Sequence, residues 1–204
     1  MNDVEIKTVN NNREKYETYT TFMDKYNLAI KNEFYFETIF ISYAMLEDRF
    51  KSFLFHINAI KSMDSCTLDI DETRNLLGNI YFEYGFKDYK DRRSFDKIDL
   101  EKITGKRRMV LALFKWAKFT KYQKERSDYL NKLKELILLF DYNEYMDILS
   151  SMNKWVNFRN KLIHDLMNKN CGSVNKLLKE KAEVGLVYAR NIDKLVVKAR
   201  KVEF

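Results

Sequence analysis

The chain has 204 residues, long enough for one domain with a substantial hydrophobic core. Hydrophobic residues make up 46% of it and aromatic residues 15%, which argues against intrinsic disorder. Proline is absent and glycine occurs five times, which argues against a β-rich or loop-rich domain; we therefore predict an all-α bundle of about six helices over residues 1–204.

Cysteine and histidine are too sparse to form a cross-linked or metal-bound framework. Cys66 and Cys171 are the only cysteines and suit a reducing compartment. His56 and His164 are far apart, so no metal or cofactor is expected. The longest apolar runs, such as residues 110–114, are too short to cross a bilayer, and no signal peptide precedes the charged start. We expect a cytoplasmic protein without a membrane partner.

Helical spacing of apolar residues dominates the first half of the chain. The predicted elements are a polar, frayed start at 1–12, helices at 13–30 and 33–62, a loop at 63–74, and a helix ending near Gly85. Residues 87–104 are charged and weakly patterned, which indicates either a long surface loop or an insertion.

The second half continues the same pattern. The predicted helices lie at 106–121, 125–140, 142–169 and 174–200. The sequence NKNCGS at 168–173 is a stop signal, in which Gly172 is placed to end the preceding helix. No period of 20–50 residues repeats, so the chain is not a solenoid.

The positive charge is concentrated in one segment. Residues 105–126 contain eight lysines and arginines against Glu125 alone, so the whole net charge of +7 resides there. Such a cluster favours phosphate-rich partners, although a solvated helix face that keeps the protein soluble explains it equally well. The candidate RNA-binding residues are Arg107, Arg108, Lys115, Lys118 and Lys121, interleaved with Trp116, Phe119 and Tyr122. These aromatic residues also suit a core position.

The predicted helix 142–169 carries three strips of different chemistry. Its apolar arc contains Tyr145, Ile148, Leu149, Met152, Trp155, Val156, Leu162, Ile163 and Leu166. Arg159 lies near the centre of that arc. Beside the arc runs an uncharged polar line of Asn153, Asn157, Asn160, His164 and Asn168.

Arg159 needs an explanation, because a guanidinium in an apolar seam costs several kcal/mol unless an anion or acceptors meet it. One explanation is a buried ion pair with Glu47, which lies within the apolar arc of the helix predicted at 33–62. The other is a cleft in which phosphate is the anion. Asn160, one turn before His164, is placed to orient the histidine ring, whose pKa near neutrality suits proton transfer.

The stretch FRNKLIHDL resembles the signature of the HEPN superfamily: an arginine, commonly followed by a polar residue, and a histidine four to six residues later. Here these residues are Arg159, Asn160 and His164. The setting is similar too, because the motif lies on a late helix, after an early long helix that carries YAMLEDRF. The resemblance extends loosely over residues 30–170. In one toxin subgroup a tyrosine follows two residues after the histidine; the residue here is Leu166, which argues against that subgroup.

The resemblance implies a metal-independent endoribonuclease, often a bacterial toxin or abortive-infection effector, with a composite site at a homodimer interface. Arg159 and His164 would be catalytic, and Asn160 would orient the histidine or the RNA. The partners it implies are RNA, a second copy and an antitoxin or other defence protein. Two alternatives stay open: a non-catalytic HEPN-like module that binds RNA, a nucleotide or a partner protein, and a structural adaptor in which Arg159 and Glu47 only fix helix register.

Overall fold

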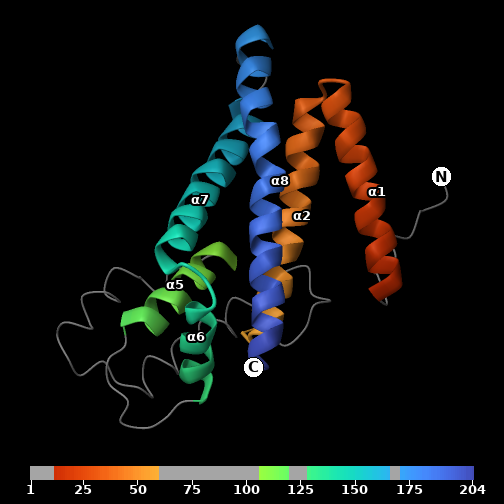
Figure 1. The fold of residues 1–204 in the computed structure, drawn as a ribbon. Helices are drawn as coiled ribbons and strands as arrows, with labels where there is room; N and C mark the ends of the chain where they lie inside the picture. The colour runs from red at the N-terminus through yellow and green to blue at the C-terminus, as the bar shows by residue number, and fades with distance from the viewer. Residues whose placement is uncertain (1–11, 60–105, 120–127, 166–170) are drawn as a thin grey trace.

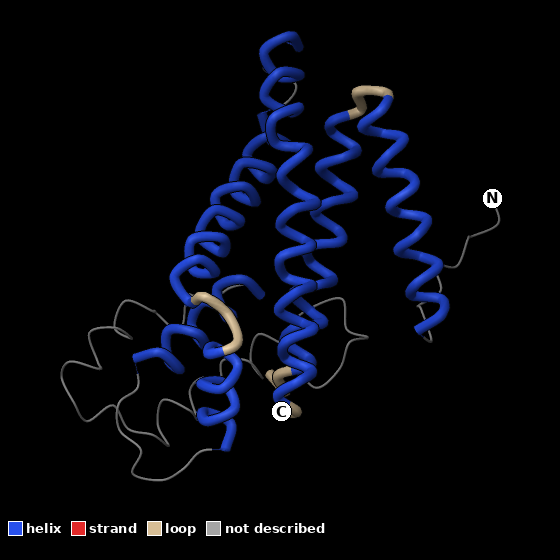
Figure 2. Tube along the Cα trace, viewed as in Figure 1, coloured by secondary structure: helices blue, strands red, loops and turns tan. Residues whose placement is uncertain are grey.

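A computed structural model describes residues 12–59, 106–119, 128–165 and 171–204, and every structural statement below refers to these ranges. They contain six helices and no strand, which confirms the predicted all-α bundle (Figures 1 and 2). The helices are α1 (Asn12–Lys31), α2 (Tyr35–His56), α5 (Lys106–Phe119), α6 (Asp128–Leu138), α7 (Tyr142–Asp165) and α8 (Cys171–Val202). The loop expected at 63–74, the helix expected before Gly85 and the segment 87–104 lie outside the described residues.

Helix α8 is the long central helix of the bundle, and α2, α6 and α7 all contact it. Its 32 residues extend over about 48 Å at the usual rise per residue. Helix α2 packs along α8, α1 packs on the outer side of α2, and α7 crosses α8 from the other side (Figure 1). Helices α5 and α6 lie beside the beginning of α7, whereas the end of α7 lies near the start of α2.

Small residues allow α2 and α8 to approach closely. On α8, Ala182, Gly185 and Ala189 are buried, and on α2 they are matched by the buried Thr38 and Ser42. The Ser42 hydroxyl donates a hydrogen bond to the Thr38 carbonyl at 2.7 Å, and Thr38 donates to Phe34 at 2.9 Å. Both hydroxyls are therefore satisfied within their own helix, and their burial carries no penalty for an unpaired polar group.

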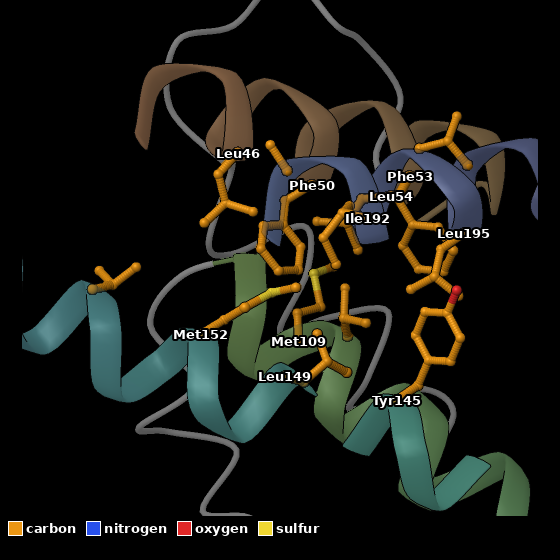
Figure 3. Packing of buried hydrophobic residues seen from close by; sticks show 14 of the residues in the cluster. Leu46, Phe50, Phe53, Leu54, Met109, Tyr145, Leu149, Met152, Ile192 and Leu195 are labelled. Carbon is orange, nitrogen blue, oxygen red and sulfur yellow. The ribbon is translucent and has the colours of Figure 1, made fainter. Parts of the chain in front are cut away.

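The main core lies between α2, α8, α5 and α7 (Figure 3). Fully buried members include Leu46, Phe50, Phe53, Leu54, Met109, Leu149, Met152, Ile192 and Leu195. Phe53 and the α5 residue Phe114 meet edge to face, with ring centroids 5.8 Å apart. The apolar spacing predicted from sequence is thus the spacing that fills this core.

The backbone geometry at the end of α2 sets the length of this helix. At the end of α2, Asn58 adopts a positive φ of 52°, and the Ala59 amide donates to the Leu54 carbonyl. This is a Schellman ending, and asparagine tolerates its left-handed position. Helix α2 therefore ends before residue 62, where the sequence pattern placed its end.

The predicted role of Gly172 is wrong. Helix α8 begins at Cys171, so Gly172 lies in its first turn instead of ending the preceding helix. A glycine after a polar stretch is compatible with either end of a helix, and the sequence pattern did not distinguish them. Among the described residues, no helix is long and apolar enough to span a membrane.

Candidate functional site

Helix α7 buries most of the arc predicted from its sequence. Tyr145, Leu149, Met152, Trp155, Val156 and Leu162 are buried. Trp155 also anchors the helix, because its indole nitrogen donates to the Lys181 carbonyl on α8 at 2.9 Å. Arg159 follows Trp155 by one turn and is only partly buried. Arg159 therefore lies at the margin of the buried arc, between the buried Val156 and Leu162, rather than deep within the core.

Arg159 is held by aromatic rings of α2. Its guanidinium carbon lies 3.9 Å from the ring centroid of Tyr43 and 5.3 Å from that of Phe40. Its Nη1 donates a hydrogen bond of 2.7 Å to the Asn160 side-chain oxygen, whereas its Nε is buried without a hydrogen-bond partner. In the described part of the chain, no carboxylate forms an ion pair with Arg159. The cation is thus stacked and oriented, and no carboxylate of the described residues neutralises it.

The ion pair considered between Arg159 and Glu47 is not formed, and that interpretation is wrong. The two carboxylate oxygens of Glu47 instead accept from the α5 residues Lys106, at 2.9 Å, and Arg107, at 2.7 Å. All three side chains are largely buried, which strengthens this charge cluster relative to a surface pair. Glu47 therefore fixes the start of α5 against α2.

His164 belongs to α7, but its side chain lies outside the part of the structure that is described. Along a regular helix it follows Arg159 by about 7.5 Å and about 140°. Asn160 is exposed and precedes His164 by four residues, so the two occupy the same face of α7. Asn160 already accepts from Arg159, and through this hydrogen bond it links the arginine to the face that carries the histidine.

The structure describes the side chains of three predicted RNA-binding residues, Arg107, Lys115 and Lys118, and these three do not form one free basic face. Arg107 is paired with Glu47, and the ammonium of the exposed Lys118 lies 5.2 Å from the ring centroid of Tyr142 at the start of α7. Lys115 is partly exposed. The side chain of Arg108 and residue Lys121 lie outside the described part, as do the aromatic side chains at 116, 119 and 122. Lys118 is separated from Arg159 by most of the length of α7.

An aromatic row on α2 was missed as the partner of Arg159. Phe36, Phe40 and Tyr43 follow one another at helical spacing, and Glu47 continues the row one turn later. The sequence does indicate that these three aromatic residues share an apolar face, because they recur at helical spacing within the helix predicted at 33–62. Only the structure separates this row from the core-facing residues Ile39, Leu46 and Phe50.

A second polar network joins α1, α2 and α8 at the opposite half of the bundle. Asp48 accepts from the Tyr19 hydroxyl at 2.6 Å and pairs with Lys15 at 3.1 Å and with Arg49. Arg49 also reaches Asp193 on α8 at 3.0 Å. Burial alone would raise the pKa of Asp48, but the hydrogen bonds from Tyr19 and Arg49 and the nearby positive charges hold it below its ordinary value. This network ties α1 and α8 to α2.

His56 at the end of α2 is structural, and it is held in its neutral form. The Arg200 Nε donates to the His56 Nε2 at 3.1 Å, which requires an unprotonated acceptor. Burial lowers the His56 pKa, and the positive charges of Arg200, Arg49 and Lys15 lower it further. Protonation would thus place a cation among three others.

Acidification is expected to destabilise the protein through His56. Because its pKa is lower in the folded chain than the unfolded value of about 6.5, the unfolded chain binds more protons between the two values. The contribution of neutral His56 to the free energy of unfolding is therefore fully present above about pH 6.5. This contribution is lost as the pH falls from about 6.5 toward the folded pKa of His56. Urea unfolding at about pH 7.5 and about pH 5.5 should show this loss, and His56→Gln should reduce it. An equal loss of stability in the wild type and in His56→Gln would contradict the assignment to His56. His164→Gln, which replaces the other histidine, is the control.

Comparisons with protein-family models, with curated proteins and with solved structures found no match to this chain.

Proposed function

We propose that the chain is a metal-independent endoribonuclease that uses Arg159 and His164 of α7, with Asn160 as the residue that orients them. One observation supports this proposal most. Arg159 is partly exposed beside Asn160 and, within the described ranges, forms no ion pair. An arginine that served only as a register device would be expected to have a carboxylate partner; Glu47, the available one, is used by Lys106 and Arg107.

The reaction proposed is attack of a ribose 2′-hydroxyl on the adjacent phosphorus. The 2′-oxygen loses its proton to a base, the bond from phosphorus to the 5′-oxygen breaks, and that oxygen receives a proton. The products are a 2′,3′-cyclic phosphate and a 5′-hydroxyl. An imidazole can serve as base or acid near neutral pH, and a guanidinium can stabilise the charge that develops on the phosphoryl oxygens.

A homodimer would supply both proton-transfer roles at once. If α7 of one protomer faces α7 of its partner about a two-fold axis, two histidines and two arginines converge on one phosphate. One histidine then removes a proton while the other provides one. In the cell we propose a toxin or abortive-infection effector in bacterial defence, controlled by an antitoxin or another defence protein.

The purified chain is expected to cleave single-stranded RNA in the presence of EDTA. The measurement is a digest followed by mapping of the product ends, with size-exclusion chromatography in parallel to determine the oligomeric state. Cyclic phosphate and 5′-hydroxyl ends support the proposal. RNA binding that weakens with salt but yields no such ends would instead indicate a non-catalytic RNA-binding module.

A further inference from the structure

The aromatic row on α2 leaves one ring open to solvent beside Arg159. Phe40 is 48% exposed, although it lies in the second turn of α2, a helix that packs in the bundle. Its ring is 6.0 Å from that of Phe36, at an interplanar angle of 39°. Tyr43, one turn further, is partly buried and packs against the core. The row thus changes from a core contact at Tyr43 to an exposed aromatic surface at Phe40.

Arg159 gives this surface a positive charge with a defined direction. Because Tyr43 covers the guanidinium at 3.9 Å and Asn160 accepts from Nη1, the arginine is held in place without a carboxylate partner among the described residues. One turn beyond Tyr43, Glu47 carries one negative charge against the two positive charges of Lys106 and Arg107. Positive charge therefore lies beside Phe40 and Tyr43, from Arg159, and one turn beyond Tyr43, from the net positive cluster at Glu47. This distribution suits an anionic ligand that also has flat apolar groups.

We propose that Phe40 is a base-stacking residue for single-stranded RNA, which it holds next to the phosphate that Arg159 contacts. The identity of the ligand rests on the proposed function. An exposed ring and an oriented guanidinium are the two groups that an unpaired nucleotide requires, since the base stacks on an aromatic side chain and the phosphate meets a cation. Stacking does not read the base by hydrogen bonds, so this contact positions the RNA without selecting its sequence.

The test measures binding separately from cleavage. A fluorescent single-stranded oligonucleotide with 2′-O-methyl riboses lacks the nucleophile, and its binding to the full chain is followed by anisotropy. Phe40→Ala is expected to weaken binding about tenfold, and Phe40→Trp to keep it near the wild-type value. Phe34→Ala is the matched control, because Phe34 is 56% exposed and lies just before the first turn of the same helix. This control should bind as the wild type does.

A second arm identifies the base as the group that Phe40 contacts. Abasic substitutions in the oligonucleotide should weaken binding to the wild type but add little to the loss in Phe40→Ala. Equal affinity of Phe40→Ala and Phe34→Ala would overturn the inference, as would the absence of RNA binding by the wild type. A loss of dimer in Phe40→Ala, measured by sedimentation, that accounts for the weaker binding would also overturn it and assign the ring to a contact between copies.

The outcomes for Phe40 and for the nuclease are distinguishable. If the wild type cleaves RNA but Phe40 proves irrelevant to binding, the stacking role fails and the nuclease remains. If binding depends on Phe40 and on the bases but no cyclic phosphate forms, the stacking site stands and the nuclease fails.

Discussion

His164→Ala and Arg159→Ala are each expected to lower the rate of RNA cleavage by at least about 100-fold while the chain stays folded. A positioned acid or base commonly contributes about 10²–10⁴ to a rate, and a group that stabilises developing charge contributes a similar factor. Stability should change much less. The Arg159 side chain is partly exposed, and its stack on Tyr43 is worth about 1 kcal/mol. The measurement is the initial cleavage rate in EDTA, with helicity and the unfolding midpoint determined for each variant.

Two further substitutions make this result specific. Arg190→Ala removes an exposed arginine from α8 and should leave the rate unchanged, which controls for net charge. Arg159→Lys keeps the charge but loses the planar group that stacks on Tyr43 and can contact two phosphate oxygens, so it should recover only part of the rate. Persistent cleavage by His164→Ala would remove the histidine from the mechanism.

The fold was predictable because it depends on local periodicity. The apolar residues of α7 recur at helical spacing, and a helix with such a stripe must bury it against other helices. Tyr145, Leu149, Met152 and Val156 are accordingly buried, and the described helix begins where the pattern does. The exact ends were less predictable, since Asn58 and Gly172 each suit more than one position at a helix end.

The surroundings of Arg159 were not predictable, because they depend on contacts between distant segments. Glu47 and Arg159 both interrupt apolar arcs, which made their pairing plausible, but periodicity gives a residue's face and not its neighbour. The start of α5 packs beside Glu47 and supplies two cations instead of one. Phe40 and Tyr43 look like ordinary core positions in the sequence, and only the crossing of α7 makes them partners of an arginine.

The packing around Gly185 was also not predictable from the sequence alone. A glycine in the middle of a helix costs about 1 kcal/mol relative to alanine, so its presence in α8 suggests a need for space, but the sequence does not name the neighbour. In the structure, Gly185 lies against Ser42 of α2 and Trp155 of α7. It is the point at which three helices meet.

Gly185→Ala is expected to destabilise the protein by about 1–3 kcal/mol, although alanine is the better helix former. Its Cβ would lie 2.6 Å from the Ser42 Cβ and 2.7 Å from Trp155 Cζ2. Neither atom can yield easily, because the Ser42 Cβ is attached directly to its backbone and the Trp155 indole is held by its hydrogen bond to Lys181. The helices must therefore separate, and the lost packing outweighs the gain of about 1 kcal/mol in helix propensity. Urea unfolding measures this change.

A double-mutant cycle locates the clash. Ser42→Gly removes the atom nearest to the new methyl group, so the double variant should be more stable than the sum of the two single changes predicts. Val187→Ala, at an exposed position on the same helix, is the control and should change stability by less than about 0.5 kcal/mol. Additive changes in the cycle would show that Gly185 matters through the backbone of α8 and not through its neighbours.

Gly185→Ala should also affect the candidate site at Arg159, because Trp155 lies one turn before Arg159 on α7. A shift of the indole away from α8 moves this part of the helix and disturbs the stack of Arg159 on Tyr43. Misplacement of a catalytic group by about 1 Å can cost about 100-fold in rate. Gly185→Ala should therefore lose more activity than its unfolded fraction explains. Adding Ser42→Gly to Gly185→Ala should restore part of the activity and part of the stability. Activity that simply follows the folded fraction would mean that the crossing of the three helices supports the fold alone and does not position the arginine.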